Sequence, residues 1–139
     1  MSDTVKMGTL TLKFLVDETA STNKLVLFEM TVPSQARVPA PHYHRDVDEA
    51  LYGLSGTLTQ TVGGIVHHVT AGHAVFVPRS IVHGFKNEHD GDARVVVTLT
   101  PGSIGKSYFE EIAAAVNAGG PPDMAKVKAI MERWGLVPQ

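Results

Sequence analysis

The chain has 139 residues, a formal net charge of −2, seven histidines and no cysteine. This length is typical of one domain with its own core, so we expect a single domain over residues 1–139. The nearly balanced charge argues against a nucleic-acid partner, which usually needs a basic surface. No apolar run reaches the roughly 18 residues of a membrane-spanning helix. Any metal site must use nitrogen and oxygen donors, because thiolates are absent.

The first ten residues, MSDTVKMGTL, lack the apolar centre and cleavage pattern of a secretory signal. Together with the absence of cysteine, this favours a cytoplasmic protein.

Short segments with apolar and polar residues in alternation follow one another from about residue 9 to about residue 100. Glycine and proline separate them, which is typical of a β-sandwich or β-barrel rather than of alternating βαβ units. We therefore predict a mostly β fold. The predicted strands are 9–16, 24–32, 49–54, 57–62, 65–69, 74–77, 82–86 and 93–100.

Two short helices are predicted in the C-terminal extension, about residues 103–135. Ser107 and Glu110 have the spacing of a capping box at the start of the first helix. Asp123 can cap the second helix, which Gly135 ends. Packing on the outside of the barrel or on a partner subunit is favoured, and a lid over the barrel mouth is the second interpretation.

A metal site is predicted around His42 and His44, which lie two residues apart. Side chains at this spacing in a strand point to the same face, so two imidazoles can share one ion. Glu49 adds a carboxylate five residues later, and His83 adds a third imidazole from another strand. These donors suit one divalent transition metal, with Fe, Mn, Ni, Co, Zn and Cu all possible, and they leave coordination positions open.

Two alternatives to this site stay open. The four side chains can instead be ancestral ligands that survive as hydrogen-bonded core groups. Asp48 can replace Glu49 as the oxygen donor, although strand alternation places it on the opposite face. We expect His67, His68, His73 and His89 to be solvated surface histidines.

The spacing of the whole set resembles the two motifs of the cupin superfamily. His42-x-His44 is followed by four residues, Glu49, six residues and Gly56. The second motif runs from Gly72 through five residues to Pro78, and then to His83 and Asn87. Two positions depart from the usual glycines of these motifs: Ala36 and Ser80.

The resemblance implies a jelly-roll barrel, in particular that of the small bacterial cupins described as quercetin-dioxygenase-like. It implies His42, His44, Glu49 and His83 as metal ligands, and a homodimer. It also implies a dioxygenase-type oxidation of a small enolic or aromatic substrate, in which Glu49 serves as ligand and proton acceptor.

Two other classes of function stay open: a non-oxidative isomerase, lyase or decarboxylase, and a barrel that binds a small ligand without chemistry.

Gly53 lies where the cupin motif usually has a branched apolar residue. Strand alternation from Glu49 places its missing side chain toward the metal, so Gly53 can open space for a substrate. A β-bulge is an equally good interpretation. Phe28, Met30, Leu51, Phe76 and Phe85 are expected to be core or cavity lining, whereas Tyr43 and Tyr52 are expected to point away from the metal.

Overall fold

A computed structural model of the chain describes residues 3–139. It contains strands and two helices, and the strands precede the helices except for one short final strand. The elements are β1 (Thr4–Met7), β2 (Leu10–Val16), β3 (Val26–Val32), β4 (His42–His44), β5 (Asp48–Ser55), β6 (Leu58–Val62), β7 (Ile65–Val69), β8 (Ala74–Val77), β9 (His83–Lys86), β10 (Ala93–Thr100), α1 (Lys106–Val116), α2 (Met124–Arg133) and β11 (Leu136–Pro138).

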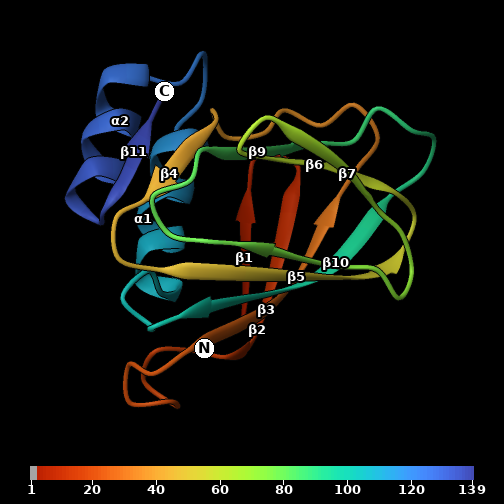
Figure 1. Cartoon of the computed structure of the whole chain (residues 1–139). Helices are drawn as coiled ribbons and strands as arrows, with labels where there is room; N and C mark the ends of the chain where they lie inside the picture. Colours follow the sequence, from red (N-terminus) through yellow and green to blue (C-terminus); the bar gives the residue numbers. More distant parts are fainter. Residues whose placement is uncertain (1–2) are drawn as a thin grey trace.

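The strands form two antiparallel sheets that face each other (Figure 1). The larger has six strands in the order β1-β2-β3-β10-β5-β8, and the smaller has five in the order β11-β4-β9-β6-β7. Neighbours far apart in sequence, such as β3 and β10, are typical of a jelly roll. The predicted fold class is therefore confirmed, although the two sheets do not close into a continuous barrel.

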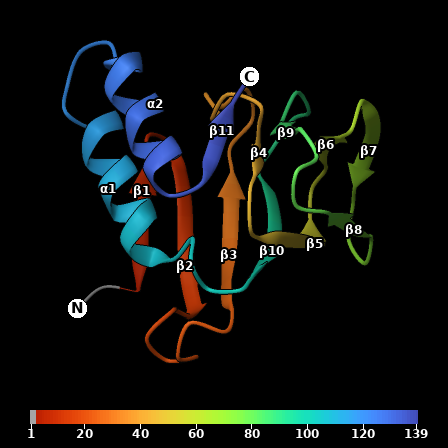
Figure 2. The same ribbon diagram turned by 60° about the vertical axis from the view of Figure 1, so that its left-hand side comes forward.

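The two helices lie on the side of the sandwich where β1 and β11 are the edge strands (Figure 2). Helix α1 contacts β1, and helix α2 contacts both β11 and α1. Strand β11 follows α2 directly and pairs with β4, so the end of the chain completes the smaller sheet. The helices thus cover the open side of the sandwich.

The core lies between the sheets and extends under the helices. Alternation decides which residues enter it: along β3, every second side chain from Val26 to Val32 is buried. Phe14 and Phe28 of the larger sheet meet Phe109 of α1, with ring centroids 5.1–5.8 Å apart. This aromatic cluster fixes α1 against the sandwich.

The predicted capping box of α1 is wrong. The N-cap residue is Gly105, and no side chain of the helix caps it. Instead, the carboxylate of Glu18, in the β2–β3 loop, accepts hydrogen bonds from the backbone N–H groups of Lys106 (2.8 Å) and Ser107 (3.1 Å). A residue of a distant loop therefore provides the side-chain cap that Ser107 was expected to provide, and it does so one turn earlier in the chain.

The predicted cap of α2 is confirmed, because the Asp123 side chain accepts from the backbone N–H groups of Ala125 and Lys126. All eight predicted strands are present within one or two residues of their expected ends. Strand β4 was predicted only through the strand spacing of His42 and His44. Strands β1 and β11 were not predicted. Both are short, and β11 follows a helix end, where nothing in the sequence alternates long enough to indicate a strand.

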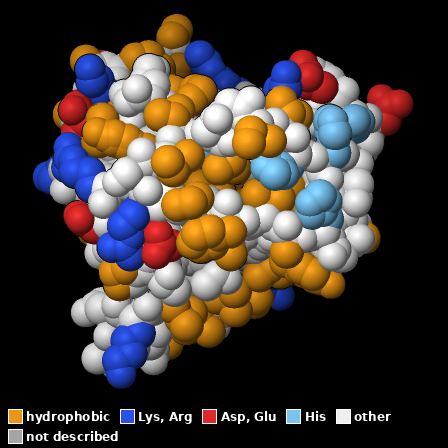
Figure 3. All heavy atoms as spheres, viewed as in Figure 1, with side chains coloured by type: hydrophobic (Ala, Val, Ile, Leu, Met, Phe, Trp, Pro, Cys, Tyr) orange, Lys and Arg blue, Asp and Glu red, His pale blue; other side chains and the backbone are white. Residues whose placement is uncertain are grey.

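Figure 3 shows one face of the molecule, with hydrophobic, basic, acidic and histidine side chains in different colours. His68, His73 and His89 are exposed and His67 is half-buried, in agreement with the prediction for these four histidines. Phe76 was expected to be interior, but it is 61% exposed on the outer face of β8. Tyr52 is 49% exposed on the same face, as its parity indicated.

Within residues 3–139, no helix has the length and apolar character needed to cross a membrane.

Candidate metal centre

His42 and His44 are held on the inner face of the smaller sheet by the short strand β4. Both side chains are buried, whereas Tyr43 between them is half-buried and has the opposite parity. Strand β4 pairs with β9 through His42 and His83, which brings the third imidazole beside the other two. Strand β11 pairs with the other edge of β4 and holds it in place.

Glu49 reaches the histidines from the opposite sheet. It lies in β5 between Leu99 of β10 and Val77 of β8. Its Oε1 atom is 3.8 Å from Nε2 of His83 and 4.0 Å from Nε2 of His44.

The neighbouring carboxylate, Asp48, is directed elsewhere. It accepts hydrogen bonds from the backbone N–H and the guanidinium of Arg79 at the surface. The structure thus brings Glu49, and not Asp48, to the three histidines.

The three imidazoles converge closely enough to fit one metal ion. One nitrogen of each lies within 4.8 Å of the others, and the ring centroids are 4.7–5.2 Å apart. Nδ1 of His42 donates to the carbonyl of Ala40 (2.8 Å), and Nδ1 of His83 donates to that of Ile81 (3.0 Å). These bonds set the tautomer that leaves Nε2 as a lone-pair donor. Nε2 of His83 is buried and has no hydrogen-bond partner, as expected of a ligand atom.

The electrostatics of the site agree with this use. Burial, together with a smaller contribution from the neighbouring His83, lowers the pKa of His42 to about 4. Burial also lowers the pKa of His44 to about 3, with His42 and His83 contributing, and it lowers the pKa of His83. The imidazoles are therefore neutral at physiological pH, the form that binds metals. Burial raises the pKa of Glu49 to about 7.

The histidines and Glu49 line a cavity of about 210 Å³ between the two sheets. Its remaining wall is almost entirely apolar and comes from both sheets, from the segment 37–40 and from the inner faces of α1 and α2. Phe28, Met30 and Phe85, expected as core or lining, are part of it. The helices therefore pack on the outside of the sandwich and also form part of the cavity wall. The two interpretations of the helix pair, packing on the barrel and covering its mouth, are thus compatible.

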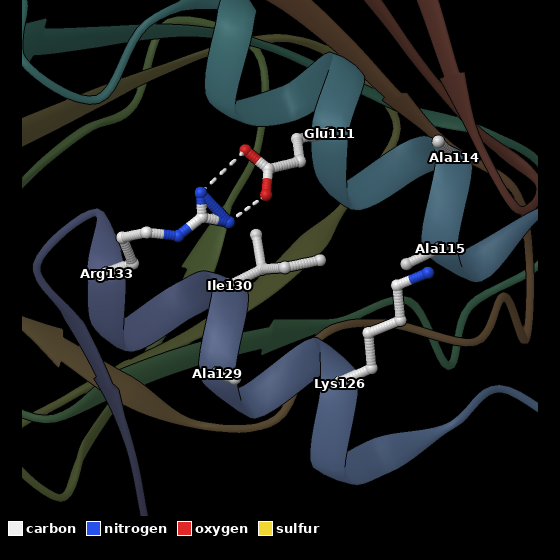
Figure 4. Close-up of a pocket in the computed structure, with 7 residues that line it drawn as sticks. All are labelled: Glu111, Ala114, Ala115, Lys126, Ala129, Ile130 and Arg133. Carbon is white, nitrogen blue, oxygen red and sulfur yellow. Dashed lines mark hydrogen bonds and ion pairs between the residues drawn. The ribbon is translucent and has the colours of Figure 1, made fainter.

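A second hollow lies on the outer side of the helix pair, between α1 and α2 (Figure 4). Glu111 and Arg133 form an ion pair across one end of it, and Ile130 lies below. Its described lining residues include no convergent lone-pair donors and no buried polar group, so it is a groove between two packed helices and not a candidate for catalysis.

Gly53 does not face the cavity, so the proposed pocket-opening role is wrong. A Cβ atom at this position would lie 2.0 Å from the carbonyl oxygen of Thr70. The backbone of Gly53 pairs with that turn: its N–H donates to His73 and its carbonyl accepts from Gly72. Register with β10 shifts beside it, so the β-bulge interpretation is the better one. Glycine is required here for close approach of two backbones.

Ser80, which stands where cupins usually have glycine, has a φ of +70°. Glycine adopts this left-handed conformation without steric cost, which explains why cupins usually have glycine at this position. The backbone N–H of Ser80 donates to the carbonyl of His44 (2.7 Å), which ties the turn before β9 to the site.

Sequence reasoning missed the cavity residues of the helices, of the segment before β4, and of β1. Among them, Arg37, Tyr108 and Lys128 are polar. The apolar periodicity of the helices indicated one buried face but contained no signal for what that face contacts.

Comparison with known proteins identifies the fold family. A family model described as a cupin domain matches residues 28–99. Protein SchB of Streptomyces halstedii is 30% identical over 60 residues, which are 43% of this chain and 44% of that protein. The chain therefore spans less than half the length of this curated relative.

Solved structures agree with that assignment. The polyketide cyclase RemF from Streptomyces resistomycificus has a TM-score of 0.58 and 25% identity, over 71% of this chain and 68% of RemF. A predicted oxalate decarboxylase from Thermotoga maritima has a TM-score of 0.63 and 19% identity, over 70% of this chain and 90% of the other. KdgF from Halomonas sp. has a TM-score of 0.58 and 22% identity, over 66% and 78% respectively. With the jelly-roll topology and the converging histidines, the matched domain places this chain in the cupin family.

Proposed function

We propose that this chain is a metal-dependent enzyme that acts on a small, largely apolar enolic or aromatic molecule, with dioxygenase-type oxidation as the first candidate reaction. The observation that carries the proposal is the convergence of three buried imidazoles and one carboxylate at the wall of an apolar cavity. His42, His44, His83 and Glu49 would hold the ion. A bound transition metal would supply Lewis acidity toward an enolate oxygen and, where it is redox-active, a site for O₂.

The size and lining of the cavity support a small substrate. A volume of about 210 Å³ lies below the range of about 300–1,000 Å³ for drug-sized ligands, which favours one or two rings. Phe28, Phe85 and Phe109 offer aromatic surface to such a ring. The apolar wall also limits the water around the reacting groups at the inner end of the cavity.

Among the residues that the structure describes, Glu49 is the only carboxylate in the cavity wall, so it is the carboxylate that can accept a substrate proton. Its position 3.8–4.0 Å from two imidazole nitrogens places it beside any molecule that approaches them. Proton abstraction from an enol by Glu49 gives the enolate, and the same carboxylate can return the proton.

A non-oxidative reaction is the second candidate. The likeness to RemF, which is named as a polyketide cyclase, favours it, because a cyclisation does not itself require O₂. Proton transfer through Glu49 with the metal only as Lewis acid would suffice for such a reaction. Binding without chemistry remains the outcome if neither reaction occurs.

Oxygen uptake separates these candidates. Protein loaded with Fe, Ni or Cu would be mixed with acetylacetone or catechol in an oxygen electrode, with zinc-loaded protein in parallel. We expect substrate-dependent uptake with a redox-active metal, and a fall of about a hundredfold or more in Glu49→Gln. Asp48→Asn is the matched control, since Asp48 pairs with Arg79 at the surface.

Substrate loss under nitrogen, without oxygen uptake, would favour the non-oxidative reaction. Saturable binding with no substrate loss under either atmosphere would contradict both enzymatic candidates.

A further inference from the structure

Two cations interrupt the otherwise apolar wall of the cavity. Arg37 precedes β4 in the segment after β3, and Lys128 lies on α2, yet both line the cavity that contains the histidines. Both side chains are exposed, whereas His42, His44 and His83 are buried. This difference in exposure indicates that the cations lie where the cavity opens to solvent and that the histidines lie at its inner end.

Neither cation has an acidic partner among the residues that the structure describes. Arg79, Arg94 and Arg133 each form an ion pair with a carboxylate. Arg37 and Lys128 form none, although Glu132 follows Lys128 by one helical turn. The one carboxylate in the cavity wall, Glu49, belongs to the inner end. Within residues 3–139, the lining of the entrance thus contains two positive charges and no negative one.

The surroundings of the two cations favour an anion over a neutral ligand. Apolar neighbours on the wall, such as Val38 and Val127, give the entrance a lower effective dielectric than open solvent, which strengthens attraction to an opposite charge. The N-terminal N–H groups of α2 do not contribute, because Asp123 already binds them. Recognition at this point therefore depends on the two side chains.

We propose that the substrate has an anionic group, with a carboxylate as the simplest case, at the end opposite the group that meets the histidines. Arg37 and Lys128 bind that group and so orient the substrate along the cavity. The inference rests on the proposed function, since it assigns a direction to a molecule bound at the metal centre. It defines the substrate class as small aromatic or enolic molecules with a distal acid.

Hydroxamates test this pairing, because the hydroxamate group binds metals. The probes are para-carboxybenzohydroxamate and its para-carboxamide, which differ mainly in charge at the far end. Versions with a vinyl spacer before the hydroxamate extend both probes. Dissociation constants would be measured by calorimetry on zinc-loaded protein, where zinc excludes redox turnover.

The variants are Arg37→Gln, Lys128→Gln, the double variant and the charge reversal Lys128→Glu. Lys126→Gln is the matched control, because Lys126 lies on the same helix but lines the outer groove between α1 and α2. Melting curves would establish that each variant is folded.

We expect the carboxylate probe to bind wild-type protein about tenfold more tightly than the carboxamide. Each single variant should reduce that preference by about three- to fivefold, and added salt should weaken it. The double variant should abolish it and Lys128→Glu should lower it further. Lys126→Gln should retain it, and carboxamide affinity should stay within twofold throughout.

Equal affinity of the two probes for wild-type protein would overturn the inference while leaving the metal site intact. A preference that survives in the double variant would overturn it as well. If neither probe binds wild-type protein, or if binding is unchanged in His44→Ala, the proposed metal site itself fails and the inference fails with it.

Discussion

The contact between Glu18 and the start of α1 allows a sharp test of how the helix pair is held over the cavity. Glu18 accepts two backbone hydrogen bonds at the N-terminus of α1, and Gly105, the N-cap residue, has no side chain to replace it. Loss of a capping side chain costs about 0.5–2 kcal/mol. Glu18 binds two N–H groups with a charged carboxylate, and its partial exposure to solvent weakens these bonds. We therefore expect Glu18→Ala to lower the free energy of unfolding by about 1–2 kcal/mol.

Thermal and urea unfolding would measure this cost, at about 3–5 °C of melting temperature per kcal/mol for a chain of this size. Glu110→Ala is the discriminating control. A capping box would make Glu110 as important as Glu18, whereas the structure predicts a cost below about 0.5 kcal/mol for an exposed helix residue. Equal losses in the two variants, or no loss in Glu18→Ala, would refute this account of the helix start.

The same contact predicts a pH dependence. Burial by itself raises the pKa of Glu18, but hydrogen bonds from Ser107 and Lys106 outweigh it, so the pKa lies below its ordinary value. A depressed carboxyl pKa contributes stability above the unfolded pKa, about 4.3 for Glu, and that stability is lost as pH falls through the folded pKa. The stability difference between wild type and Glu18→Gln should therefore be constant from pH 5 to 8 and shrink below about pH 4. A difference that grows on acidification would contradict it.

Gly53→Ala should lower the free energy of unfolding in urea by about 2 kcal/mol or more, because the new Cβ would meet the Thr70 carbonyl. A variant as stable as the wild type would show that the close approach of these two backbones does not require glycine at position 53. Asp48→Ala should retain full metal content by elemental analysis, since Asp48 binds Arg79; a loss of metal would make Asp48 a ligand. Asp123→Ala should cost about 1 kcal/mol in thermal unfolding as a lost N-cap, whereas an unchanged melting temperature would count against the cap.

Patterns within short stretches of sequence predicted much of the fold. Alternation located eight strands, and the His42-x-His44 spacing placed two imidazoles on one face, because both depend on the period of a single strand. Contacts between segments far apart in the sequence could not be predicted from such patterns. The capping of α1 by Glu18 joins residues 88 positions apart, and no local pattern distinguishes it from a capping box. Gly53 shows the same limit, since the Thr70 turn that fills the space beside it comes from another segment.

The candidate site was predictable as a set of four side chains and not as a cavity. Its chemistry is concentrated in motif residues, but its wall includes α1, α2 and β11, which join the sandwich only through contacts with segments far away in the sequence. The sequence alone therefore could not identify Arg37 and Lys128 as cavity residues. The homodimer and the cytoplasmic location stay predictions, and sedimentation of the purified protein would decide the first.

Metal content tests the central claim most directly. Purified protein and His44→Ala, prepared side by side and incubated with Fe, Mn, Ni, Co, Zn or Cu, would be analysed for bound metal after desalting. The account predicts one transition-metal ion per chain in the wild type and a loss of most of it in the variant, since His44 is one of three converging imidazoles. Wild-type protein that retains none of these metals, or a variant that retains as much as wild type, would contradict a metal centre at this site.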